Sequence, residues 1–247
     1  MELYQDAIIK IFFGDKNTAV YPDVVRGKIS EQLYDQEPFR SIGKKFLIHP
    51  STYVFLHQVH GVEGAVITQE NGKFPAFTQE GDYLVTNVPG IGIGVATADC
   101  MPLVLVDPVK KAVGVVHAGW RGLVAGVVEK TVERMQFEYG SRLGDINFLI
   151  GPSAQKCCYE VGKDFFDQAC AVRPSIEKFL NGALSEINDR FFFDNKKFLL
   201  ALFFEKGFVE SDFNFLHAEC TICKPLYCSY RRDKMSPLRQ LTIVSLK

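Results

Sequence analysis

Three polar side chains that can bind a metal or act as a nucleophile each follow an apolar stretch typical of a β-strand. They are His60 after residues 53–56, Cys100 after residues 91–98 and His117 after residues 112–116. Chemistry often lies where a buried strand ends, because the strand fixes position and the following loop gives access. Two imidazoles and a thiolate suit tetrahedral zinc with an open fourth position. They suit a Cys–His nucleophilic pair equally well, with Cys100 as the nucleophile and His117 as the base.

The spacing of Cys100 and His117 predicts that these two side chains lie close together. Residues 103–117 read as a hairpin of two apolar strands joined by a longer loop. A hairpin places the residue before its first strand beside the end of its second strand. Nothing local fixes His60. Because alternate residues of a strand face opposite sides, His57 and His60 are not expected to share one metal.

A glycine-rich turn after His117 is a candidate anion site. Gly119 and Gly122 flank Arg121, and an amphipathic helix is predicted over residues 123–139. Free backbone N–H groups at a helix start attract anions, and a nearby arginine strengthens that attraction. We therefore expect a phosphate or carboxylate to bind here.

The elements that position these residues are a mixture of strands and helices in one domain spanning residues 1–247. No internal repeat or linker divides the chain. The strands are expected at residues 7–13, 53–60, 82–87, 91–98, 103–106, 112–117, 146–150, 213–217 and 241–246. The helices are expected at residues 24–34, 123–139, 163–172, 174–184 and 195–206.

The composition argues against nucleic-acid and membrane partners. The net charge is −1, from 28 basic and 29 acidic residues, and no dense basic patch is present. No window approaches eighteen consecutive apolar residues, and the acidic start does not resemble a signal peptide. Seven cysteines is an odd number, which favours reduced thiols and a cytoplasmic protein of unknown oligomeric state.

The remaining cysteines give a weaker signal. Cys220 and Cys223 have zinc-ribbon spacing, Cys228 lies nearby, and His217 could be a further ligand. We favour the interpretation without a metal, because a domain of this size needs no metal for stability. The adjacent pair Cys157–Cys158 has no assigned mechanism.

Six ordered motifs resemble the laccase-domain family, whose members were first called multicopper polyphenol oxidases and are now described as purine nucleoside phosphorylases. The motifs are His57-Gln58-Val59-His60-Gly61, Thr97-Ala98-Asp99-Cys100-Met101-Pro102, His117-Ala118-Gly119-Trp120-Arg121-Gly122, Ile150-Gly151-Pro152, Cys157-Cys158-Tyr159-Glu160-Val161-Gly162 and Ser229-Tyr230-Arg231-Arg232-Asp233. The resemblance implies an α+β fold: a single domain of mixed β-sheets flanked by helices, layered α/β/β/α.

The resemblance also implies a site and an activity. Zinc would be held by His60, Cys100 and His117, with copper as the alternative metal. The reaction would be phosphorolysis of adenosine, inosine and S-methyl-5'-thioadenosine, with a side activity as an adenosine deaminase. On that mechanism Arg121, with Gly119 and Gly122, would bind phosphate. Asp99 would orient His60 or His117.

Three other functions stay open at this point. One is a Cys–His hydrolase or amidase with Cys100 as nucleophile. The second is copper-linked polyphenol oxidation, which five histidines support poorly. The third is a non-catalytic partner protein, suggested because residues 13–17 match the family pattern badly.

Overall fold

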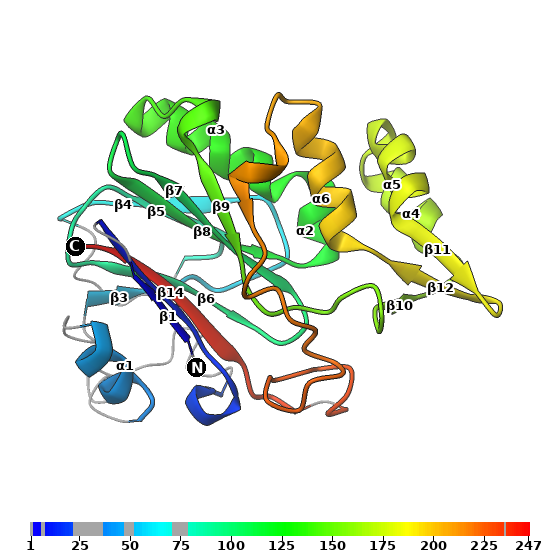
Figure 1. Cartoon of the computed structure of the whole chain (residues 1–247), viewed down its shortest axis with the longest axis horizontal. Coiled ribbons are helices and arrows are strands. Elements are labelled where there is room, and N and C mark those ends of the chain that lie inside the picture. The colour runs from blue at the N-terminus through cyan, green and yellow to red at the C-terminus, as the bar shows by residue number, and fades with distance from the viewer. Residues whose placement is uncertain (1, 6–7, 22–36, 47–51, 71–78, 235) are drawn as a thin grey trace.

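A pair of β-sheets forms the centre of the molecule, and helices cover the outer faces (Figure 1). The computed structural model describes residues 2–5, 8–21, 37–46, 52–70, 79–234 and 236–247. The expected α+β architecture with α/β/β/α layers is confirmed. The expected helix over residues 24–34 lies outside the described residues.

The six-stranded sheet carries the predicted hairpin at its centre. Its strands, in spatial order, are β13 (Phe213–Asn214), β9 (Asn147–Ile150), β7 (Met101–Asp107), β8 (Ala112–Ala118), β5 (Tyr83–Thr86) and β4 (Gly64–Ile67). Every residue of β7 and β8 is buried. Leu103 and Leu105 point to the core beneath the helices, whereas Val104 and Val106 point to the core between the sheets. Burial on both faces explains why the strands are continuously apolar.

The five-stranded sheet closes the second core. Its strands, in spatial order, are β1 (Glu2–Gln5), β2 (Ile9–Phe13), β14 (Gln240–Leu246), β6 (Gly92–Thr97) and β3 (Tyr53–Val54). Helix α1 (Phe39–Phe46) lies on its far side, where the Phe39 ring is 6.2 Å from that of Phe55. A Cβ on Gly94 would approach the Phe55 ring to 2.4 Å. The small residues of β6 therefore make room for aromatic rings.

The helices lie mainly over the six-stranded sheet. They are α2 (Trp120–Ala125), α3 (Val127–Tyr139), α4 (Phe165–Val172), α5 (Glu177–Ala183) and α6 (Asn195–Phe204). A small sheet of β10 (Glu160–Val161), β12 (Arg190–Phe193) and β11 (Leu184–Ile187) extends beyond α4 and α5. None of the described helices is both long and apolar enough to cross a bilayer.

Several predicted elements differ from the structure. The helix expected over residues 174–184 begins as a 3-10 turn over Pro174–Ile176 and continues as α5, and the strand expected over residues 213–217 is limited to β13. The single helix expected over residues 123–139 is wrong, because Gly126 adopts a left-handed conformation with φ of 101° and separates α2 from α3. The strand expected over residues 53–60 is limited to β3. Beyond it the chain turns at His60, whose φ is 62°.

Candidate active site and metal centre

The hairpin brings Cys100 and His117 together, as its spacing predicts. Pro102 of β7 is paired with His117 of β8, and Met101 is paired with Ala118. Cys100 directly precedes β7, so its thiol lies at the same edge as His117. His117 is buried, and Cys100 is partly exposed to a pocket.

His60 completes the group from a turn that is distant in sequence. Its Nε2 atom lies 3.7 Å from Cys100 Sγ, and its ring centre lies 4.7 Å from that of His117. One ligand atom from each of the three residues lies within 4.8 Å of the others. We call His60, Cys100 and His117 the pocket triad. His57 also lines the pocket but lies outside the triad, consistent with the sequence analysis.

Asp82 is the functional residue that the sequence analysis missed. Its fully buried carboxylate is 2.7 Å from His117 Nδ1 and accepts backbone hydrogen bonds from His60 at 3.0 Å and Gly61 at 2.6 Å. Because a carboxylate can only accept, Nδ1 of His117 is the donor and Nε2 is left to face the site. One side chain thus holds the ring of His117 and the backbone at His60.

The electrostatics of Asp82 follow from these contacts. Burial of the carboxyl group opposes its ionisation. The hydrogen bond and charge of His117, with the backbone N–H groups of Gly61 and His60, outweigh burial and lower the pKa of Asp82. The carboxylate is therefore negatively charged beside His117.

The hydrogen bonds of Asp99 go to the C-terminal loop, whereas His117 is bonded to Asp82. Asp99 has φ of 83° and its carboxylate faces the C-terminal loop. It accepts hydrogen bonds from Thr221 Oγ1 at 2.6 Å, Ser229 Oγ at 3.1 Å and the backbone N–H of Arg231 at 2.8 Å. Asp99 therefore fastens the residue before Cys100 to that loop, while Asp82 holds His117.

Gly119 and Gly122 allow the turn of His60 to lie against helix α2. A Cβ on Gly119 would approach His60 Cδ2 to 2.5 Å and Cys100 Sγ to 3.2 Å. A Cβ on Gly122 would approach the backbone oxygen of Gly61 to 2.8 Å. The structure thus gives both glycines a steric role next to the pocket triad.

The pocket above the triad has a volume of about 410 Å³, within the usual range for small-molecule sites. Aromatic and guanidinium groups form its walls: Trp120, Tyr159, Tyr230, Arg121, Arg231 and Arg239. Arg121 is exposed and lies 4.5 Å from the Trp120 ring centre, and Arg231 lies 4.7 Å from that of Tyr159. Aromatic faces suit a planar base, and guanidinium groups suit phosphate.

The described N-terminal residues do not reach this pocket. Gly14 donates its backbone N–H to Leu241, and Lys16 forms an ion pair with Asp233 at 3.1 Å. Among the described residues, the pocket lining begins at His57. The poorly matching segment at residues 13–17 therefore lies beside the C-terminal loop.

Cys100 and His117 stabilise each other as thiolate and imidazolium. Burial opposes the Cys100 thiolate, but the charge and hydrogen bond of His117, aided by His60, lower the pKa of Cys100 to about 6. Burial likewise opposes the His117 imidazolium, and Cys100 with Asp82 outweighs it and raises the pKa of His117 to about 9. A low thiol pKa is typical of metal ligands and of nucleophiles.

The donor set fits a single zinc ion. Zinc bonds to nitrogen and sulfur place tetrahedral ligand atoms about 3.3–3.8 Å apart, and the triad atoms lie within 4.8 Å of one another. Asp82 supplies the carboxylate that commonly holds a metal-binding histidine. Three ligands leave one coordination position for water or substrate. One thiolate with two imidazoles also suits copper, so the donors alone do not choose between these metals.

Comparison with known proteins places this chain in a family. Residues 36–247 match the family described as multi-copper polyphenol oxidoreductase laccase. A protein of Aquifex aeolicus named purine nucleoside phosphorylase is 41% identical over 165 residues, covering 67% of this chain and 70% of the relative. The purine nucleoside phosphorylase YlmD of Bacillus subtilis is 29% identical over 202 residues, covering 79% of this chain and 71% of the relative.

Further relatives match different shares of their own length. A Mus musculus relative, also named purine nucleoside phosphorylase, is 33% identical, and the match covers 67% of this chain but 38% of the relative. The crystal structure of Bacillus licheniformis protein YfiH has a TM-score of 0.81 at 23% identity, covering 97% of this chain and 93% of that one. YlmD from Geobacillus stearothermophilus has a TM-score of 0.77 at 24% identity, covering 97% and 91%. With the family match over most of its length, this chain belongs to the multi-copper polyphenol oxidoreductase laccase family, which includes proteins named purine nucleoside phosphorylase.

Proposed function

We propose that this chain is a zinc-dependent purine nucleoside phosphorylase. Its substrates would be adenosine, inosine and S-methyl-5'-thioadenosine, with adenosine deamination as a side activity. The observation that carries the proposal is a single pocket with the pocket triad at its base and aromatic and guanidinium groups on its walls. The names of the relatives support the reaction class.

The pocket triad would hold the ion, with Asp82 keeping the proton on Nδ1 of His117. When bound, zinc would supply a Lewis acid at the base of the pocket. Copper is the alternative metal, consistent with the description of the family. In either case the same buried carboxylate would hold the ring of His117 and the backbone of His60 in place.

The pocket walls would orient the two substrates. The rings of Tyr159 and Trp120 would give the purine an apolar wall, and the guanidinium groups of Arg231 and Arg121, which lie over these rings, would offer positive charge. We assign phosphate to Arg121. The close packing of Gly119 and Gly122 against the His60 turn supports a positioning role for these glycines.

The reaction follows from that placement. A phosphate oxygen forms a bond to the anomeric carbon while the bond from that carbon to the purine nitrogen breaks. The bonding electrons leave with the purine, which takes up the proton that hydrogen phosphate loses, and the products are free base and the sugar 1-phosphate. Positive charge develops on the sugar, and a fixed phosphate on the face opposite the leaving purine stabilises it.

The decisive experiment compares nucleoside turnover with and without phosphate. Zinc-loaded protein should convert inosine or adenosine to free base and ribose 1-phosphate only when phosphate is present. Arg121→Ala should raise the phosphate KM roughly ten- to a hundredfold, since one charge-assisted contact contributes about 1.5–3 kcal/mol. Adenosine deamination, which uses water, should change much less. Absence of turnover by fully metal-loaded protein would reject the proposal.

A second function is favoured by the low pKa of Cys100. With His117 as base and Asp82 behind it, Cys100 has the partners of a nucleophilic Cys–His–Asp group. Such a hydrolase or amidase would keep its activity in chelator and lose it to iodoacetamide. Activity that is lost on chelation and restored by zinc would exclude this alternative. A folded protein without turnover in either assay would favour the non-catalytic partner protein.

A further inference from the structure

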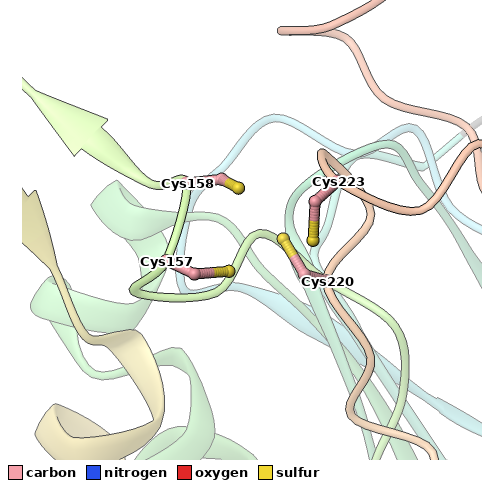
Figure 2. A group of neighbouring side chains, drawn as sticks. All are labelled: Cys157, Cys158, Cys220 and Cys223. Carbon is pink, nitrogen blue, oxygen red and sulfur yellow. The ribbon is translucent and has the colours of Figure 1, made fainter.

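Four cysteines from two loops gather outside the pocket. Cys157 and Cys158 lie in the turn between β9 and β10, and Cys220 and Cys223 lie in the loop after β13. Figure 2 shows the two pairs facing each other across the gap between these loops. Their four Sγ atoms lie within 4.8 Å of one another. We call these four residues the cysteine cluster.

Backbone hydrogen bonds bring the two loops together without help from the cysteine side chains. Ser153 and Cys220 form an isolated parallel bridge, in which the Ser153 N–H donates to Glu219 O and the Thr221 N–H donates to Ser153 O, both at 3.0 Å. Arg232 holds the second loop from inside, donating to the carbonyls of Thr221, Ile222, Lys224 and Tyr227. The positions of the thiols are therefore set by the fold.

The arrangement around Cys220 is that of a metal-binding loop. Cys220 is buried, and the backbone N–H groups of Cys223, Ile222 and Gln155 interact with its sulfur. The Lys224 N–H also donates to Cys220 O at 3.2 Å, which closes the turn. N–H groups directed at sulfur stabilise a thiolate and leave it available to a cation.

We propose that the cysteine cluster is a second metal site, which binds one zinc ion through four thiolates and joins the two loops. Four cysteine ligands are typical of structural zinc, and a four-coordinate zinc–sulfur site places its sulfurs about 3.8 Å apart. Binding displaces the thiol protons to solvent as four zinc–sulfur bonds form. No oxidation is involved.

Zinc at the cysteine cluster would support one wall of the pocket. Tyr159, which lines the pocket, directly follows Cys158. On the other loop, Thr221 follows Cys220 and donates to Asp99, the residue before Cys100. One ion would thus hold together two segments that approach the pocket triad from different parts of the chain.

The test is the zinc content of variants of the full chain, measured by mass spectrometry after zinc chloride loading under reducing conditions and desalting. Cys157→Ser combined with Cys223→Ser changes the two exposed cysteines and should lose one zinc per chain relative to the wild type. Cys170→Ser, on α4 and outside the cluster, is the matched control and should lose none. Equal zinc content in the double variant and the wild type would overturn the proposal.

A second measurement distinguishes this site from the pocket triad. It leaves the four cysteines of the cluster intact, so it does not depend on whether the Cys157→Ser, Cys223→Ser variant folds. Cys100→Ala combined with His117→Ala should retain one zinc, and X-ray absorption at the zinc edge should show four sulfurs at about 2.3 Å. Nitrogen or oxygen ligands in that variant would overturn the assignment. So would an intact mass of the non-reduced wild-type protein that shows disulfides among the four cysteines. None of these results depends on phosphorylase activity.

Discussion

The pocket triad and the cysteine cluster both collect soft ligands from distant parts of the chain, but they differ in number and surroundings. The triad offers three ligands at the base of a pocket of about 410 Å³, with the buried carboxylate of Asp82 behind them. The cluster offers four thiols between two surface loops, and Cys157 and Cys223 are exposed. Three ligands leave a position for substrate, whereas four close the coordination shell. On the proposed functions, the pocket triad would take part in chemistry and the cysteine cluster would support the fold.

The largest difference should appear when one ligand is removed from each site. Cys100→Ala should lower kcat/KM for phosphorolysis by about a thousandfold, corresponding to roughly 4 kcal/mol of lost charge stabilisation. Cys223→Ser should lower it by only a few fold, because this residue is outside the pocket lining. Steady-state kinetics with inosine and phosphate checks both variants. Comparable losses would remove the distinction between the two sites.

Replacing the carboxylate behind the triad should have the next largest effect. Asp82→Asn removes the charge beside His117 and should weaken zinc affinity by about ten- to a hundredfold. Asp107→Asn is the matched control, because Asp107 is also buried and also accepts backbone hydrogen bonds, from Val109 and Lys110 at the far end of the hairpin. Competition against a chelator should show unchanged affinity in the control. A similar loss in both would indicate a general effect on folding.

Thiol reactivity in metal-free protein should also distinguish the two sites. At pH 7 most of Cys100 is thiolate, since its pKa is lowered to about 6, whereas burial and neighbouring thiols raise the pKa of Cys158 to about 11. After allowance for the lower nucleophilicity of the more acidic thiol, iodoacetamide should label Cys100 about fifty-fold faster. The Cys100 rate should rise with pH through 6 and level off, while the Cys158 rate keeps rising. Peptide mass spectrometry measures both, and parallel profiles would contradict the assigned environments.

The smallest effect is expected from adding one methyl group beside the triad. In Gly119→Ala the new Cβ would meet the His60 ring at 2.5 Å, so the ring must shift and turnover should fall roughly tenfold. Gly144→Ala is the control, because its Cβ would meet nothing within 4 Å. Kinetics and zinc content of the two variants test this. Unchanged turnover in Gly119→Ala would show that the turn of His60 adjusts freely.

The sequence predicted those parts of the site that depend on local geometry. Cys100 and His117 are joined by one hairpin, so strand spacing alone places them together. The contribution of Asp82 could not be found this way, because its contacts with His60 and His117 span 22 and 35 residues. An isolated aspartate before a short strand carries no local signal for such a role.

The two halves of the cysteine cluster show the same limit. The spacing of Cys220 and Cys223 is that of a zinc ribbon, but the sequence alone favoured no metal there. His217, the further ligand considered, stacks on Phe13 with ring centres 4.9 Å apart. The thiols that lie beside those of Cys220 and Cys223 belong to Cys157 and Cys158. The two loops are brought together by a backbone bridge between Ser153 and Cys220. No pattern in the sequence predicts that bridge.

Asp82 also ties the backbone of three segments together at the pocket triad. Its backbone carbonyl accepts from the His117 N–H at 2.8 Å while its carboxylate accepts from the His117 ring at 2.7 Å. Its backbone N–H donates to Glu63 at 2.7 Å, which ties the same residue to the segment that follows His60. These contacts place both histidines of the pocket triad without help from an ion. A metal bound there would therefore meet ligands that the fold already holds in position.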